Sequence, residues 1–414
     1  MTILFVFGWT IQIGGHFKSA LAHMRCLREM GHEVLLIAPG CREEMMREFR
    51  NIDVKVHTFS KGPKRGRFPS ARGAKEIIEI CREGGVDLIN SQDMEGLAAG
   101  YKAAIRQSKA FVYTMAGGPV HRAFQPREVD AIYYSQELLD GMADRYNLDK
   151  NKISVIRARI DVRVYKPTKA DPAFLDKYKL PRSGKKVLMA IRLTQGKRPW
   201  LENLMSFAAQ AGEEDFDVHV IIAGEGGLLE HFRERAGQIN ARAGRQVVHM
   251  VGPVYGIDQM SKLYSHADIV VGNGRGIIEA MACRKPVVVL GENGEGALVE
   301  PENIDRVAEY NFSGRHFRYR QGTVRDSISV LKDLVHDDAT LAQAGRFSLE
   351  YIKKHMDAAI GAREILSVYE KALTKKHSQI DYIKWHLRIV QFWAKEGLEW
   401  RINALRKNLE TDNG

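Results

Sequence analysis

Residues 267–289 read ADIVVGNGRGIIEAMACRKPVVV and place a glycine-rich loop between an apolar run and a segment with helical character. Glycine lets backbone N–H groups approach an anion closely, and the N-terminus of a following helix adds positive potential. Two further glycine loops, at 223–227 and 291–296, also follow apolar runs. One such loop is weak support because glycine is common in strand–helix turns for steric reasons, but three in one half of the chain favour a nucleotide site.

Glu279 lies three residues after Gly276, near the first turn of the helix expected there. The helix dipole stabilises a carboxylate at this place by a few tenths to about 1 kcal/mol, which alone could account for an acid. Its neighbours Ile277, Ile278 and Ala280 are apolar, however, and a charge among them favours a ligand over free solvent. The functional alternative is a carboxylate that accepts hydrogen bonds from two ribose hydroxyls.

Arg192 and Lys197 lie in KVLMAIRLTQGKRPW, just after the first apolar run of the second half of the chain. Two cations in one loop could converge on a ligand, and a diphosphate would need such cations. The other interpretation is two solvated surface cations, and the position of these residues leaves both interpretations open.

The elements that must hold these side chains alternate along the chain. Strands are expected at 2–8, 33–40, 86–93, 110–118 and 130–135, and again at 186–191, 216–224, 247–252, 267–274 and 285–291, with amphipathic helices between many of them. Such alternation predicts parallel sheets covered by helices, with ligands bound at the carboxyl ends of the strands. The polar stretch 168–186 is the expected linker between two α/β domains.

The composition of the chain limits the classes of function that it can have. The chain has 414 residues, 44% of them hydrophobic, and 62 Lys+Arg against 51 Asp+Glu give a net charge of +11. This length suits two domains, and the positive charge favours an anionic partner, whether nucleic acid, a nucleotide-like ligand or an acidic membrane surface. No uncharged apolar run approaches the ~18 residues of a membrane span, and the N-terminus lacks the basic region of a signal peptide. The four cysteines lack disulfide or metal-ligand spacing, so a cytosolic protein is expected.

Several segments together resemble a GT-B glycosyltransferase of family 4, a group that is mostly retaining and metal-independent. The resemblance covers residues 1 to about 370, and AIRLTQGK and IEAMACRKPVVV carry it most specifically. The other segments are IGGHFKSALAHMRCLREMGHEVLLIAPG, KISVIRARIDVRVYKP and VVHMVGPVYGIDQMSKLYSHADIVV.

The resemblance implies two facing, doubly wound, Rossmann-like α/β domains followed by a helical extension. Residues 1–165 would form the acceptor-side domain and residues 166–355 the nucleotide-sugar donor domain. Residues 356–414 would return to the first domain as helices and end in a basic amphipathic extension.

The resemblance also implies residue roles. Arg192 and Lys197 would neutralise the donor diphosphate as the sugar–phosphate bond breaks, and Glu279 would hold the ribose. Retention in this family is usually explained by front-face attack, in which the departing phosphate helps to deprotonate the acceptor, so no dedicated nucleophile, metal or cofactor is expected. The remaining donor contacts are expected from Gly14 and Gly15 at the phosphates, Gly252, Pro253 and Val254 at the nucleobase, and Gly274, Arg275 and Gly276 at the donor sugar.

The chain departs from the family pattern at three places. Val271 stands where the first of two glutamates is usual, and Ala116 and Gln92 stand where histidines are usual. His121 and Asp93 are the nearby candidates for an acceptor-side catalytic group. A solvent-facing loop histidine is the alternative interpretation of His121.

Two basic regions bear on the acceptor. The loop 60–75 could dock an anionic acceptor or acidic lipid head groups, or it could be a solvated basic loop. In the last stretch, Ile380, Ile383, Leu387 and Val390 repeat at helical spacing among tryptophans and basic residues. Such a helix can lie in a membrane interface or dock on the first domain. We expect docking for 355–375 and a membrane or partner surface for the helix beyond it.

The leading hypothesis is a retaining hexosyltransferase that uses a UDP-sugar, with a GDP-sugar as the alternative. It would act on the hydroxyl of a lipid-linked or saccharide acceptor in polysaccharide biosynthesis, in the cytoplasm and peripherally at the inner face of the membrane. A sugar-nucleotide 2-epimerase of the same fold is the alternative enzyme. A basic nucleic-acid-binding protein is the non-enzymatic alternative, although the sequence shows no nucleic-acid motif, so no nucleic-acid partner is expected.

Overall fold

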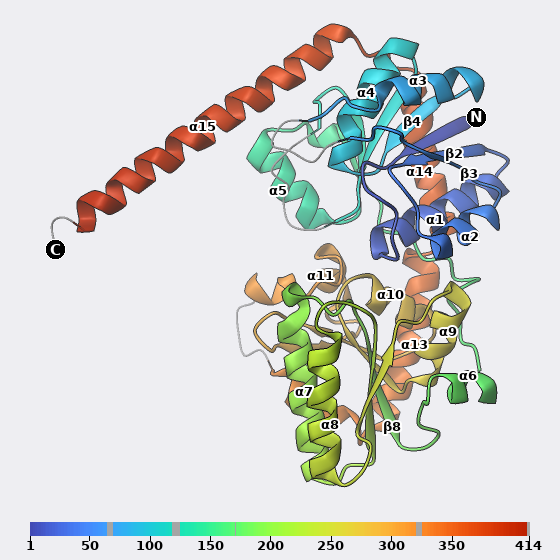
Figure 1. Ribbon diagram of the computed structural model, residues 1–414, viewed down its shortest axis with the longest axis vertical. Helices are drawn as coiled ribbons and strands as arrows, with labels where there is room; N and C mark the ends of the chain where they lie inside the picture. The colour runs from blue at the N-terminus through green and yellow to red at the C-terminus, as the bar shows by residue number, and fades with distance from the viewer. Residues whose placement is uncertain (64–68, 118–124, 170, 320–324, 412–414) are drawn as a thin grey trace.

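A computed structural model describes residues 1–63, 69–117, 125–169, 171–319 and 325–411, with side chains of the last helix as far as Glu396. Two sheets lie one above the other in Figure 1, each covered by helices. The first sheet is parallel throughout, and in the second only the edge strand β13 runs antiparallel to its neighbour. The expectation of two doubly wound, Rossmann-like domains with a helical extension is confirmed.

The first sheet has the order β3 (Lys55–Thr58), β2 (Glu33–Ala38), β1 (Thr2–Val6), β4 (Leu88–Ser91), β5 (Ala110–Met115), β6 (Asp130–Tyr133) and β7 (Ile153–Val155). The helices of this domain are α1 (Gly15–Glu29), α2 (Glu43–Arg50), α3 (Ala74–Glu83), α4 (Met94–Gln107) and α5 (Gln136–Tyr146). Apolar runs form the strands β1, β2 and β5 because both faces of a parallel sheet are covered. In β1, Ile3 and Phe5 enter one core layer while Leu4 and Val6 enter the other.

The second sheet has the order β10 (Val248–Gly252), β9 (Val218–Ala223), β8 (Lys185–Ala190), β11 (Ile269–Gly272), β12 (Val287–Leu290) and β13 (Gly296–Leu298). Its main helices are α7 (Arg198–Glu213), α8 (Leu229–Ala243), α9 (Ile257–His266), α10 (Arg275–Ala282) and α13 (Asp338–His355), with the shorter α6 (Pro172–Lys177), α11 (Ile304–Glu309) and α12 (Ser327–Leu334). In both sheets the strand order reverses direction beside the first strand of the domain, where a doubly wound fold places its ligand.

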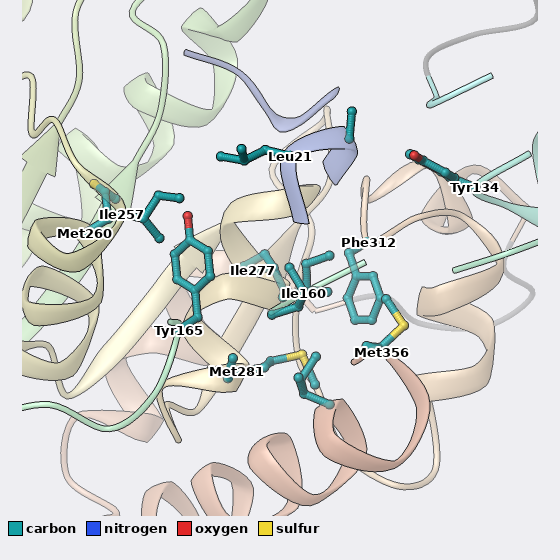
Figure 2. Packing of buried hydrophobic residues seen from close by; sticks show 14 of the residues in the cluster. Leu21, Tyr134, Ile160, Tyr165, Ile257, Met260, Ile277, Met281, Phe312 and Met356 are labelled. Atoms are coloured by element: carbon teal, nitrogen blue, oxygen red, sulfur yellow. The ribbon is translucent and has the colours of Figure 1, made fainter. Parts of the chain in front are cut away.

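The chain passes between the domains at two adjacent places. The backbone N–H groups of Arg159 and Ile160 both donate to the carbonyl of Met356 at 2.9 Å, so the outgoing and returning segments lie side by side. Figure 2 shows Ile160 and Met356 in an apolar seam that also contains Leu21 of the first domain and Ile277 of the second.

The expected linker at 168–186 is instead packed on the second domain. Phe174 in α6 and Leu180 are both buried, and the Lys262 ammonium contacts the Asp171 carboxylate at 2.7 Å. The sequence indicated a linker because most residues of this stretch are polar. Its two buried apolar side chains, Phe174 and Leu180, attach it to the domain.

Two helices follow the second crossing. α14 (Ala358–Leu373) packs against α1, β5 and β6 of the first domain, and its Tyr369 hydroxyl is hydrogen-bonded to Asn90. α15 (Gln379–Thr411) begins on the first domain and runs away from it in Figure 1. Among the helices that the structure describes, none is long and apolar enough to cross a bilayer.

Candidate functional site

The loops that follow β1 and β11 face each other across the junction. A Cβ added at Gly15 would lie 3.1 Å from Cβ of Arg275, so glycine lets the first turns of α1 and α10 approach this closely without a shift of the Arg275 side chain. Nη1 of Arg275 donates to Oγ of Ser19 at 2.8 Å and to the carbonyl of Arg159 at 3.1 Å. The carboxyl ends of the two sheets therefore enclose a shared site.

Glu279 is buried at the centre of this junction. Its carboxylate accepts hydrogen bonds from Nε of Arg275 at 2.8 Å and from the hydroxyl of Tyr264 at 3.2 Å, and Nζ of Lys18 lies 3.6 Å away. Burial by itself would raise the pKa of Glu279, but the charges of Lys18 and Arg275 outweigh it and lower that pKa below its ordinary value. The site thus holds a buried carboxylate in its charged form between the domains.

A second group of charges lies after β8. Nζ of Lys197 donates to Oδ1 of Asn273, 3.2 Å away in the loop after β11, and also lies 4.3 Å from the centre of the Trp200 ring. Burial lowers the pKa of Lys197, and the neighbouring charges of Arg192 and Arg315 lower it further. Cations from separate loops therefore converge at the carboxyl edge of the second sheet, an arrangement that suits an anionic ligand.

The three glycine loops have different roles. At Gly224 a Cβ would lie 1.8 Å from the carbonyl oxygen of Ile191, and at Gly226 it would lie 2.2 Å from that of Leu193. These glycines let the 223–227 loop pack on the segment that carries Arg192. In the 291–296 loop, a Cβ at Gly296 would lie 2.7 Å from Cα of Ser327. Two of the three loops thus owe their glycines to close packing within the domain.

The third loop is open at Gly272 and Gly274, where a Cβ would meet no atom within 4 Å. The N–H of Gly274, however, donates to the carbonyl of Phe312 at 2.6 Å. Backbone N–H contacts from Gly274 to a donor sugar were predicted, and this hydrogen bond uses that N–H within the protein. The predicted sugar contact of Arg275 meets a similar obstacle, because its guanidinium already binds Glu279 and Ser19.

Of the predicted nucleobase segment, Val254 alone lines a small hollow between the domains. Gly252 has φ +76° and no neighbour that a Cβ would meet, Val254 is buried, and Pro253 lies between them. The lining residues come from both domains and are Ile13, Lys18, Glu44, Met45, Glu48, Val254, Gly256, Ile257 and Met260.

Gly14 lies at the N-cap of α1 with the extended φ of −167°, and Gly276 lies in the first turn of α10.

Asp93 caps α4. Its carboxylate accepts hydrogen bonds from the N–H of Gly8 at 2.9 Å and from that of Gly96 at 2.7 Å. Burial raises the pKa of Asp93 to about 7. These bonds tie the loop after β1 to α4, so the geometry gives Asp93 a positioning role, and its catalytic role stays a prediction. His121 lies outside the described residues, and Val271 and Gln92 are buried.

Two ion-pair groups join the domains at the edge of the site, and the sequence did not point to them. Arg42 donates to Oε1 of Glu225 at 2.8 Å and to the hydroxyl of Tyr255 at 3.3 Å, and that hydroxyl donates to Oε2 of Glu225 at 2.6 Å. Arg315 makes a bidentate pair with Glu137, with distances of 2.7 and 2.6 Å. We call these groups the Arg42 clasp and the Arg315 clasp.

Comparison with known families assigns the chain. A family model described as Glycosyltransferase Family 4 matches residues 13–164, and one described as Glycosyl transferases group 1 matches residues 184–310. The chain is a GT-B glycosyltransferase that resembles family 4. The two matches cover the segments from which the site above is built.

Solved structures share the fold of this glycosyltransferase. A glycosyltransferase from Rickettsia africae ESF-5 is 19% identical, with a TM-score of 0.66 over 91% of this chain and 99% of that one. Anabaena HepE in complex with UDP and glucose is 18% identical, with a TM-score of 0.65 over 89% and 99%. A putative UDP-N-acetylglucosamine 2-epimerase from Listeria monocytogenes is 14% identical, with a TM-score of 0.57 over 91% and 97%. No curated protein matched the sequence.

In the described parts of the glycosyltransferase, no group of three or more His, Cys, Asp or Glu side chains is arranged to hold a metal ion. His23, the buried histidine nearest the crossing, bonds to the Ala158 carbonyl at 2.7 Å, and burial lowers its pKa to about 4. It is a neutral packing residue at physiological pH.

Proposed function

We propose that this glycosyltransferase moves a sugar from a UDP-sugar to an acceptor hydroxyl with retention of configuration and without a metal. The observation that carries the proposal is the place of Lys197 at the edge of the second sheet. There it contacts Asn273 in the loop that leads to Glu279, and it lies near enough to Arg192 for that charge to lower its pKa. The pKa of a lysine that is lowered by burial and by other cations would be restored by a bound diphosphate. UDP is preferred over GDP because the structure of Anabaena HepE, which shares the fold, holds UDP.

The chemistry follows from this charge arrangement. The acceptor oxygen attacks the anomeric carbon on the face from which the diphosphate departs, the carbon–oxygen bond to the diphosphate breaks, and the acceptor proton passes to the departing phosphate oxygen. Negative charge grows on the diphosphate in this step, and cations fixed in a partly water-excluded site stabilise it most where it develops. Arg192 and Lys197 would supply that stabilisation.

Arg192 and Lys197 would thus form a diphosphate clamp, and the rest of the donor would extend from it. The nucleobase would lie beside Gly252 and Val254, and the ribose would approach Glu279. Because Arg275 and Tyr264 already bind the Glu279 carboxylate, ribose binding requires Lys18 or Arg275 to shift, or the domains to separate. Donor binding therefore requires a rearrangement of the contacts around Glu279.

For the acceptor we propose a lipid-linked or saccharide precursor of a polysaccharide, met at the cytoplasmic face of a membrane. The support is the basic loop 60–75, of which residues 64–68 lie outside the described part, and the helix α15.

The test combines a thermal-shift screen of UDP, GDP, ADP and CMP with a transfer assay that uses the matching nucleotide sugars. We expect the largest shift from UDP and sugar transfer only when a hydroxyl acceptor is present. Interconversion of UDP-sugar epimers without an acceptor would show a 2-epimerase, and no shift from any nucleotide would contradict the proposal.

A further inference from the structure

The helix α15 has two unlike faces in its described part. It spans 33 residues, or roughly 50 Å at about 1.5 Å per residue. Its first half lies on the first domain, and its second half extends beyond that domain in Figure 1.

The inner face fixes the helix on the first domain. Tyr382, Trp385 and Ile389 are buried in the same core cluster as Tyr101 of α4, and the Trp385 and Tyr101 rings are 6.0 Å apart. Nη2 of Arg388 donates to the carbonyl of Tyr146 at 3.1 Å. This packing therefore fixes the orientation of α15 and determines which of its faces points away from the domain.

The outer face carries an aliphatic row. Ile380, Ile383, Leu387 and Val390 repeat every three or four residues and are between 50 and 62% exposed. Single exposed aliphatic side chains are ordinary on a protein surface, but four aligned on one helix face mark a surface that contacts something apolar. The domain to which α15 belongs does not cover them.

The charges beside this aliphatic row indicate what kind of surface covers it. Lys376, Lys384 and Lys395 are exposed, whereas the two acids of the described residues from 376 to 396 are partly buried and already bonded, Asp381 to Ser378 and Glu396 to Arg145. An aliphatic row flanked by lysines fits the boundary between acyl chains and anionic head groups. A second copy of the chain seated on this row would bring the two sets of lysines together, which like-charge repulsion disfavours.

We propose that the outer face of α15, made of Ile380, Ile383, Leu387 and Val390 with Lys384 and Lys395, docks on an anionic membrane surface. The apolar side chains enter the head-group boundary, and the lysines contact lipid phosphates. Because α15 is packed on the acceptor-side domain, docking holds that domain at the membrane. This proposal does not depend on which nucleotide sugar is the donor.

The test measures co-sedimentation of the full chain with phosphatidylcholine vesicles, with and without phosphatidylglycerol. We expect binding to the anionic vesicles that weakens with added salt, and a loss of about tenfold or more in Ile383→Ser/Leu387→Ser. Met30→Ser, the same kind of change at an exposed apolar residue at the end of α1, is the matched control and should bind as the parent does. Thermal unfolding checks that both variants remain folded.

Three results would overturn the proposal. They are the absence of binding to anionic vesicles by the parent chain, equal binding by the folded double variant, and equal binding to neutral and anionic vesicles. A dimer in light scattering that the double variant loses would show instead that a second copy covers the row.

Discussion

Glu279 lies at the junction between α1 and α10. Its carboxylate faces Lys18 and Arg275, and the side chains of Arg275 and Glu279 are almost fully buried. A buried ion pair adds little to stability compared with apolar residues of the same shape. Removing one partner, however, leaves the other charge buried without compensation, which strongly destabilises the fold. At this scale, the residue predicted to bind ribose also neutralises the interface.

We therefore expect Glu279→Gln to lower the free energy of unfolding by ~3 kcal/mol, because it leaves Arg275 buried without its acid. Glu279→Gln/Arg275→Met should recover a part of the loss. Urea unfolding of the three proteins checks this, and a Glu279→Gln variant as stable as the parent would assign Glu279 to the ligand alone.

The lowered pKa of Glu279 also sets a pH dependence. Its contribution to stability is fully present above the ordinary value of 4.5 and is lost as pH falls through the lower pKa of the folded state. The difference in unfolding free energy between the parent and Glu279→Gln should therefore narrow only below about pH 4.5. Urea unfolding in a pH series measures it, and narrowing between pH 5 and 7 would be inconsistent with a lowered pKa.

At the scale of elements, the loop after β9 holds the loop after β8 in place. Gly224 has φ +153°, and a Cβ there would lie 1.8 Å from the Ile191 carbonyl oxygen. Gly224→Ala should cost about 1–3 kcal/mol and reduce sugar transfer, because the backbone that carries Arg192 must move. Gly227→Ala is the matched control, since a Cβ there meets nothing within 4 Å. Equal stability and turnover in the two variants would show that the 223–227 loop does not position Arg192.

The extension gives a second prediction at this scale. Trp385 is almost fully buried, whereas Ile383 is half exposed on the opposite face. Trp385→Ala should lower the free energy of unfolding by about 3–5 kcal/mol and Ile383→Ala by less than about 0.5 kcal/mol. Thermal and urea unfolding compare them, and similar values would mean that α15 does not pack on the first domain in solution.

The sequence predicted elements well where one local pattern decides them. Apolar runs identified the strands of both sheets except the edge strands β3, β7 and β13, which were not predicted. The spacing of Ile380, Ile383, Leu387 and Val390 identified a helix. The choice between docking and a membrane surface was posed for the whole helix, but the structure shows that the aromatic face docks and the aliphatic face stays outside. The face that packs is the one that fits the surface of α4. The sequence of α15 alone does not contain that information.

The site shows the same limit. Arg192, Lys197 and Glu279 could be singled out because each follows a strand in a short, recognisable segment. Lys18, the Arg42 clasp and the Arg315 clasp could not, because their partners lie in the other domain and at distant positions of the chain. The presence of Lys18 in the first turn after the Gly14–Gly15 loop was the one local signal available.

At the scale of the whole molecule, the two clasps hold the domains together around the site. Both connect the first domain to loops at the carboxyl edge of the second sheet, and the buried ion pairs of Glu279 lie between the domains as well. Separation of the domains is one way for a nucleotide to reach Glu279, and the two clasps oppose that separation.

We expect Arg42→Ala/Arg315→Ala to increase the radius of gyration in small-angle X-ray scattering while costing only about 1–2 kcal/mol, since partly exposed ion pairs contribute about 0.2–1 kcal/mol each. Arg47→Ala, which removes an exposed arginine paired only within α2, is the control. Unchanged scattering in the double variant would mean that the apolar seam alone keeps the domains closed.

Calorimetric titration of UDP and uridine tests most directly whether Arg192 and Lys197 form a clamp for the donor diphosphate. We expect the parent to bind UDP much more tightly than uridine, and Lys197→Ala to weaken UDP binding by about tenfold or more, since a hydrogen bond to a charged group is worth about 1.5–3 kcal/mol. Uridine binding should not change, and Arg198→Ala, the adjacent cation paired with Glu202 on the surface, should bind UDP as the parent does. A Lys197→Ala variant that keeps the parent's affinity for UDP would contradict the clamp.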